Sequence, residues 1–288
     1  MKPKKKAKTL KQKPKQNSQT QQPQTQENDA VNDGNLLTFG GHLEVFRQML
    51  FRILGVAGVI AVVIFCFKDT TWEILMAPSE WDFCTYKWIE QAMQAIGMDF
   101  HFDEFHIDII ATDLSTQFMT HITTAVYLGV LRASPYILYE LFRFISPALN
   151  ENERRYSVQV AGIIYVLFIH GVLMSYFVLF PISFRFLGTY SVSAKVVSNI
   201  TLDSYISTFT SLTLVMGLVF QLPVIAFFLG KLGFVISELL SRYRKHSFII
   251  IMLVAAIITP PDLMTLILVT IPLYLLYEVS IRVVKWVE

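Results

Sequence analysis

Residues 158–182 read VQVAGIIYVLFIHGVLMSYFVLFPI and contain no Asp, Glu, Lys or Arg. A helix needs about 20 mostly apolar residues, each rising ~1.5 Å, to cross the ~30 Å hydrocarbon layer of a bilayer. This run is long enough, so it predicts a transmembrane helix. The whole chain agrees: 53% of its 288 residues are hydrophobic and only 16% are charged, whereas soluble domains carry about 25% charged residues.

Five further apolar runs lie at residues 50–67, 122–145, 205–229, 248–258 and 263–279. Together the runs predict an all-α, polytopic membrane protein with six transmembrane helices. The fifth run is short for a full crossing, so either its neighbours shield its ends or the bilayer is thinned there. Prolines in or beside the runs should bend several helices, because proline lacks the backbone N–H of a helical residue: they are Pro135, Pro147, Pro223 and Pro272.

Lys and Arg are unevenly divided between the two faces that six crossings define. The N-terminal tail, the segments after the second and fourth runs, and the C-terminus are basic, whereas residues 68–113 hold two Lys and ten Asp or Glu. Cytoplasmic loops are enriched in Lys and Arg. Both termini are therefore predicted to be cytoplasmic, in a multi-pass protein of the cytoplasmic (inner) membrane.

Residues 1–38 form a separate block, rich in Lys, Gln, Asn and Thr and poor in large apolar side chains. Such a segment cannot bury enough apolar surface to fold, so we predict a disordered cytoplasmic tail that contacts anionic lipid. Residues 39–288 then form the six-helix domain. Its long outer loop, at about 68–113, is predicted to lie as a cap on the membrane surface.

Motifs of common enzyme classes are missing from the sequence. It contains no P-loop, no G-x-S-x-G and no H-E-x-x-H, which mark phosphate binding, hydrolase nucleophiles and zinc proteases. Cys66 and Cys84 have no neighbours at metal-site spacing. We therefore predict no enzyme activity, no metal, no cofactor and no nucleic-acid partner, and whether the two thiols pair stays open.

Polar side chains inside the apolar runs are candidates for functional contacts, because an ionisable group there costs ~2.5–3.5 kcal/mol to insert. Arg132 and Glu140 lie in the second run, His170 in the third and Gln221 in the fourth. A hydrogen-bonded packing role is the structural alternative for each of them.

Carboxylates also gather at the predicted cytoplasmic boundary, in GGHLEVFR (40–47) and SPALNENERR (146–155). Ordinary interfacial charge would explain them. However, a guanidinium group gains from bidentate pairing with a carboxylate where the dielectric is low. Glu44, Arg47 and Glu153 are therefore candidate binding residues.

Short motifs follow one another along the chain in a recognisable order. They are IATD (110–113), ASPYILYE (133–140), FISPAL (144–149), ERR (153–155), YFVLFP (176–181), FQLPV (220–224), TPPD (259–262), IPL (271–273) and YE (277–278). This series resembles the TatC family, the multispanning subunit of the twin-arginine protein translocase. The resemblance runs from about residue 39 to 280 and leaves out the tail and most of the first outer loop.

The resemblance implies a receptor and assembly core for protein export. Members bind twin-arginine signal peptides at the cytoplasmic face and recruit single-span TatA/TatB-type subunits to move folded cargo across the membrane, driven by the proton-motive force. It also implies self-association in a larger complex. On this mapping Glu153 engages the arginine pair, Phe144 and Pro147 frame it, and Glu44 and Arg47 belong to the segment before the first helix.

The segment before the first helix departs from the family pattern. The family motif H-L-x-E-L-R has a glutamate where this chain has Val45, and the acid here is Glu44. One residue is ~100° around a helix, so Glu44 would serve in its place only if the segment rotates or is not helical.

The intramembrane polar residues also depart from the pattern. The family often has a glutamate where this chain has Gln221, whose amide can hydrogen-bond but cannot carry a proton. Arg132 stands where an apolar residue is expected, and we predict that it interacts with Glu140 through a neighbouring helix or water. With Asp262 of the TPPD motif, these residues are predicted partner contacts.

Two other functional classes fit a polytopic chain. An ion-coupled small-solute transporter is the main alternative, although the internal repeats and midplane ion site of many transporters are not evident. A membrane scaffold is the other, and it would tolerate loss of the loop carboxylates.

Overall fold

The computed structural model describes residues 39–99, 101–145, 157–191, 193, 199–259 and 262–288. The chain divides into two units, Met1–Leu43 and Glu44–Glu288, and the contacts below all lie within the second. The predicted tail at 1–38, Pro147 and Glu153 lie outside the described residues.

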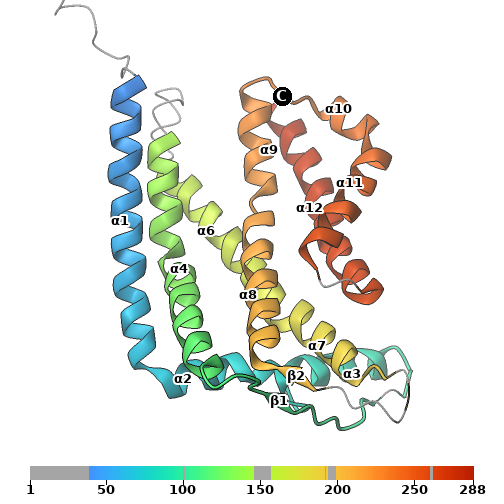
Figure 1. The fold of residues 1–288 in the computed structure, drawn as a ribbon. Helices are drawn as coiled ribbons and strands as arrows, with labels where there is room; N and C mark the ends of the chain where they lie inside the picture. The colour runs from blue at the N-terminus through green and yellow to red at the C-terminus, as the bar shows by residue number, and fades with distance from the viewer. Residues whose placement is uncertain (1–38, 100, 146–156, 192, 194–198, 260–261) are drawn as a thin grey trace, which may run out of the picture. The chain divides into compact units, whose positions relative to one another are not determined.

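Helices make up most of the described structure (Figure 1). In chain order they are α1 (Phe39–Cys66), α2 (Lys68–Met76), a 3₁₀ turn (Ala77–Ser79), α3 (Cys84–Ala95), α4 (Thr116–Ile145), α6 (Ser157–Met174), a π-helical segment (Ser175–Leu179), α7 (Phe180–Thr189), α8 (Leu202–Val219), α9 (Leu222–Lys231), α10 (Ser237–Arg242), α11 (Arg244–Ile258) and α12 (Leu263–Val287).

Four helical segments are long and apolar enough to cross a membrane: Leu43–Cys66, Ala161–Thr189, Leu202–Lys231 and Leu263–Val287. They correspond to the first, third, fourth and sixth predicted runs. The second and fifth runs form α4 and α11, but α11 has only 15 residues, about 22 Å at 1.5 Å each. Over the described residues the fold is that of an α-helical membrane protein with four clear candidate spans.

The core lies where α6, the π-helical segment, α8 and α12 meet. Leu179, Leu212, Met216 and Val269 are fully buried there. The chain of α6 approaches α8 so closely that a Cβ on Gly171 would lie 2.5 Å from the carbonyl oxygen of Met216. Small residues of this kind let membrane helices pack backbone to backbone.

Helix α1 packs more sparsely than the other candidate spans. Only 17% of its apolar stretch is buried, against 39% in each of the other three. It lies close to α4 at Gly129, where an added Cβ would lie 2.7 Å from Cβ of Ala61 and 2.9 Å from the carbonyl oxygen of Ala57. Near the far end, the ring of Phe65 stacks on His121 with centroids 4.3 Å apart.

The prolines act in two ways. The fourth predicted span is interrupted between α8 and α9, directly before Pro223 at the first turn of α9, so an interruption lies where a bend is predicted. Pro135 and Pro272 instead lie inside the continuous helices α4 and α12. The third span also changes its helical form, through the π-helical segment before Pro181, a feature that the sequence did not predict.

The segment predicted to form an outer cap contains α2, α3 and the strand β1 (Ile109–Ile110), which lie across one end of the helices (Figure 1). β1 pairs in parallel with β2 (Ile200–Thr201), with Ile109 opposite Ile200, so two short strands interrupt the predicted all-α pattern. The buried Tyr86 of α3 donates a hydrogen bond to the Pro181 carbonyl, 2.9 Å away. Burial raises the pKa of the Tyr86 phenol, which keeps it protonated as that donor.

Candidate functional site

A buried carboxylate lies near the end of α4. The Glu140 residue is only 5% exposed, and its Oε1 lies 3.4 Å from Nη1 of Arg52 on α1. The hydroxyl of Tyr136 donates to the same oxygen at 3.0 Å, and Nη1 of Arg143 lies 4.0 Å away. A buried charge is tolerated when it is paired and hydrogen-bonded, so this group is a satisfied ion pair that joins α1 to α4.

Aromatic packing continues this contact toward the helix ends. The rings of Phe46 on α1 and Phe144 on α4 meet edge to face, with centroids 5.8 Å apart. Phe144 is half-buried, and the described part of α4 ends one residue later at Ile145. The predicted site residue Phe144 thus lies where α4 leads into residues 146–156, the segment with Pro147 and Glu153.

Glu44 forms a second, exposed cluster on α1. Its Oε1 accepts from Nη2 of Arg47 at 2.7 Å and from Nε2 of Gln48 at 3.1 Å, with 47% of the Glu44 side chain exposed. The segment is helical, so the five-residue separation from the buried Met49 places Glu44 ~140° away from it around the axis. Glu44 and Arg47 therefore face away from α4, and the structure does not bring them beside Phe144.

Val45 stands where the family motif predicts a glutamate. It lies in the same helical turn as Glu44 and is 42% exposed. Glu44 could replace that glutamate only if the segment rotates or is not helical. The segment is helical, so only a rotation remains. The side chains of Glu44 and Val45 point in directions ~100° apart.

The predicted intramembrane residues occupy separate places. Gln221 is buried at the α8–α9 break, where its Nε2 donates to the Ile164 carbonyl at 3.1 Å, and its Oε1 has no partner among the described residues. Asp262 caps the start of α12, its Oδ1 accepting from the Thr265 amide at 2.7 Å. His170 is exposed and lies 5.9 Å, between ring centroids, from Phe220.

Arg132 is exposed on α4 and forms no ion pair with any residue that the structure describes. Glu140 is paired instead with Arg52. The two predicted partners are thus not brought together directly, and no linking side chain joins them in the described part of the chain. Arg132 keeps its candidate role as a polar contact on an exposed helix face.

Arg52 and Tyr136 are the residues that sequence reasoning missed. Neither residue stands out from its sequence motif. The position of Arg52 inside the first apolar run, at the same predicted end as Glu140 in the second run, was a usable signal, because unlike charges at one membrane depth favour pairing.

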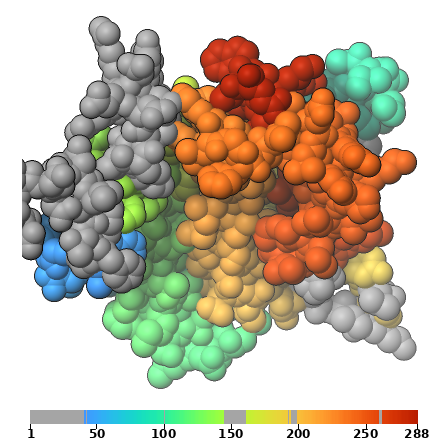
Figure 2. Space-filling view, turned by 90° about the horizontal axis from the view of Figure 1, so that it is seen from above, coloured from blue at the N-terminus to red at the C-terminus, as the bar shows by residue number. Residues whose placement is uncertain are grey.

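A third charged group lies at the ends of α10, α11 and α12. Arg244 and Glu278 form a two-point ion pair, with Nε–Oε1 at 2.9 Å and Nη2–Oε2 at 3.0 Å. Glu288 accepts from the amide and the hydroxyl of Ser237, both at 2.5 Å, and these bonds lower the pKa of its carboxyl. Figure 2, which looks down on this end, shows the segment from α9 to α12 at the surface in orange and red.

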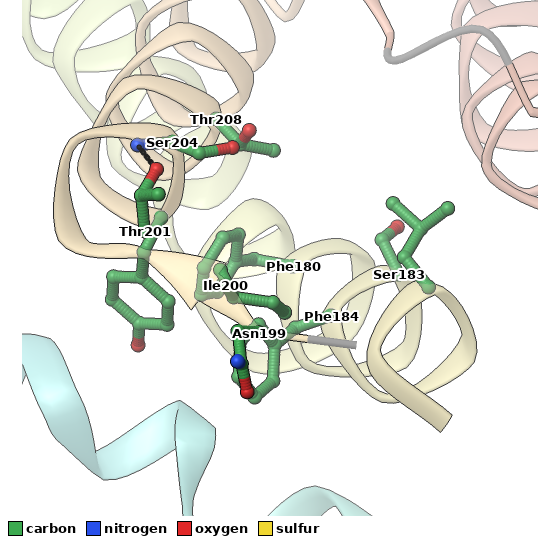
Figure 3. Close-up of a pocket in the computed structure, with 10 residues that line it drawn as sticks. Phe180, Ser183, Phe184, Asn199, Ile200, Thr201, Ser204 and Thr208 are labelled. Carbon is green, nitrogen blue, oxygen red and sulfur yellow. Dashed lines mark hydrogen bonds between the residues drawn. The ribbon is translucent and has the colours of Figure 1, made fainter. Parts of the chain in front are cut away.

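A hollow of about 270 Å³ lies at the other end of the helices, beside β2. Phe180, Phe184 and Ile200 form its apolar side, and Ser183, Ser204 and Thr208 contribute hydroxyl groups (Figure 3). Among the described residues its lining contains no charged side chain, so this part of the hollow offers no carboxylate to a guanidinium ligand. Both cysteines, Cys66 and Cys84, are free thiols.

The fold and these contacts define a class: a multi-pass α-helical membrane protein with paired charges gathered at one end of its helices. The chain belongs to the TatC family of Sec-independent protein translocase proteins, whose family model matches residues 41–272. It is therefore a translocase subunit and not an enzyme, and the family sets aside the small-solute transporter.

Individual relatives match 56% to 89% of this chain. The TatC protein of Blattabacterium sp. subsp. Periplaneta americana is 32% identical, over 89% of this chain and 98% of its own length. TatCy of Bacillus subtilis is 38% identical over 56% of this chain and 63% of its own length. The crystal structure of the twin arginine translocase receptor TatC superimposes with a TM-score of 0.67 at 29% identity, covering 85% of this chain and 99% of that one.

Proposed function

We propose that this chain is the signal-peptide receptor and assembly core of a twin-arginine protein export system. The observation that carries the proposal is the match, in sequence and fold, to TatC proteins over almost their full length, including the translocase receptor. The chain binds twin-arginine signal peptides of folded cargo at its cytoplasmic face. The proton-motive force drives the transport that follows.

The proposal includes six membrane crossings with both termini in the cytoplasm. Within the second unit, the first turns of α1 lie at the same end of the helices as the end of α4 and the end of α12 (Figure 1). An even number of crossings requires this arrangement. Basic residues concentrate in the segments at that end, which the positive-inside rule assigns to the cytoplasm. Helices α4 and α11 supply the two crossings beyond the four clear candidate spans.

The proposed binding surface lies at this cytoplasmic end. Glu153 and Pro147 are assigned to it from the family motif, and Phe144 supports the assignment because it lies at the end of α4 that leads into their segment. Glu44 contributes an exposed carboxylate that now binds Arg47. A guanidinium of the signal peptide has the same fork geometry, so it can take the place of Arg47 on Glu44.

The proposed partners are single-span TatA/TatB-type subunits, further copies of this chain, and membrane lipid. The exposed apolar side chains of α1 and α11, among them Leu54, Val59, Ile249 and Leu253, leave helix faces free for a transmembrane partner. Arg132, Gln221 and Asp262 are proposed polar contacts to such partners.

Site-specific crosslinking tests the receptor proposal. A photoreactive amino acid is placed at Phe144, and the crosslink to a twin-arginine peptide is compared with that to a twin-lysine peptide in membranes. We expect a strong crosslink with arginine only, lost in Glu153→Gln and kept in the control Glu151→Gln. Equal crosslinking of the two peptides, or equal effects of the two substitutions, would contradict a carboxylate receptor for the arginine pair.

A further inference from the structure

A second hollow lies between α2 and the first turns of α4, at the end opposite the proposed receptor surface. Its volume is about 410 Å³, within the ~300–1,000 Å³ range of small-ligand sites. Lys68 and Trp72 of α2 line one side, and Phe118 and His121 of α4 line the other.

Hydrogen-bonding groups around this hollow lack partners. Nε1 of Trp72 and Nε2 of His121 are both buried, and neither has a hydrogen-bond partner among the described residues. An indole N–H can only donate, and leaving a buried donor unpaired costs free energy. Neither nitrogen has exposed surface in this conformation, so an acceptor in the hollow would remove that cost once the ring turns toward it.

Lys68 adds an uncompensated positive charge. Residues 68–113 hold only two lysines among ten carboxylates. The other, Lys87, lies 3.5 Å from Asp82, whereas Lys68 forms no ion pair with a described residue. A lysine that stays unpaired in so acidic a segment, at the mouth of a hollow, is placed for an anion from outside the chain.

Exposed apolar side chains near the hollow favour an anion that has hydrocarbon chains. Phe118 lines the hollow, and Phe67 and Met119 adjoin Lys68 and Phe118 in the sequence. All three are between 57% and 66% exposed, as lipid-contacting side chains are. Tryptophan and lysine are typical of the membrane interface, where phospholipid headgroups lie. A phospholipid supplies both a phosphate for Lys68 and acyl chains for these apolar side chains, whereas a free anion supplies only the charge.

We propose that this hollow binds a phosphate group, supplied by the headgroup of an anionic phospholipid. The Lys68 ammonium pairs with the phosphate, and the indole of Trp72 turns toward the hollow so that its N–H donates to one of the phosphate oxygens. His121, whose ring stacks on Phe65, offers its Nε2 as a further hydrogen-bonding group to the phosphate. The acyl chains run along the exposed Phe118 and Met119.

Lipid retention on the purified full-length chain tests this site. The delipidated protein is titrated with phosphatidylglycerol, phosphatidylcholine or inorganic phosphate, and bound molecules are counted by native mass spectrometry. Lys68→Gln should lower the preference for phosphatidylglycerol over phosphatidylcholine about fivefold, from the ~1 kcal/mol that one basic residue contributes at a membrane surface. The matched variant Lys87→Gln should keep the preference of the original chain.

The arms of the titration separate the possible sources. Lipid binding that depends on Lys68 and is unaffected by inorganic phosphate assigns the site to a phospholipid. Phosphate binding that depends on Lys68, without a lipid preference, supports the site but moves the source to solution. Trp72→Phe keeps the ring and removes the N–H, and it should weaken the same ligand. Unchanged binding in both Lys68→Gln and Trp72→Phe, with the proteins folded by circular dichroism, would overturn the proposal.

Discussion

Arg52→Gln should destabilise the chain by about 1–2 kcal/mol through the loss of the ion pair with Glu140. Removing one partner of a fully buried pair costs ~3–5 kcal/mol, and an exposed pair contributes ~0–1 kcal/mol. Here the side chain of Glu140 is 6% exposed and that of Arg52 is 47% exposed, so the cost falls between these limits. The hydroxyl of Tyr136 still donates to Glu140 in the variant, so the expected cost lies nearer the lower limit.

A double-mutant cycle measures this ion pair directly. Unfolding midpoints in detergent are compared for Arg52→Gln, Glu140→Gln and the double variant, and we expect the pair to be coupled by about 0.5–1.5 kcal/mol. Arg143→Gln is the matched control, because Arg143 is 4.0 Å from Glu140 and 63% exposed; its effect should stay below ~0.5 kcal/mol. Additive effects of the two substitutions would refute the reasoning, since they would show that Arg52 and Glu140 do not stabilise each other.

Three further predictions follow from other contacts. Gly129→Val should destabilise the α1–α4 crossing by about 1–3 kcal/mol, because the added side chain meets Ala61 at 2.7 Å; a thermal melt checks it, and an unchanged midpoint would count against this crossing. Asp262→Ala should cost about 1 kcal/mol by removing the N-cap of α12, measured in the same way with Asp262→Asn as the control that keeps a capping oxygen. The lowered pKa of Glu288 means that its contact stabilises the chain above the carboxyl's unfolded pKa and that this stabilisation is lost as pH falls through the lower folded pKa; exchange of the Ser237 amide should therefore be slower in the original chain than in Glu288→Gln at neutral pH, and equal in both at low pH.

Most of the helical framework could be predicted because membrane helices are encoded by long apolar runs. All six runs form helices, and the fourth breaks before Pro223 as the missing N–H of proline suggests. The π-helical segment and the pairing of β1 with β2 could not be predicted. Both depend on contacts between distant segments, and two-residue strands such as Ile109–Ile110 are too short to show an alternating pattern.

The candidate site was predicted less completely than the fold. The motifs identify Glu44, Arg47 and Phe144, but they do not show that these residues lie apart. Glu44 faces away from α4, whereas Phe144 of α4 packs against α1, and both directions depend on how each helix is rotated. Glu140 was recognised as costly inside a span, yet its partner Arg52 was not, because the vertical register of two helices is set by packing. The roles of Glu153 and Pro147 stay predictions.

The sparse packing of α1 has a consequence for how that helix is oriented. A helix that contacts its neighbours at few points can rotate about its own axis at little cost in free energy, because few interdigitated side chains oppose the rotation. The Arg52–Glu140 ion pair connects a side chain of α1 to α4, so it opposes rotation of α1 about its axis. Together with the contact of Phe46 with Phe144, it holds the direction in which Glu44, more than two helical turns from Arg52 along the same helix, presents its carboxylate.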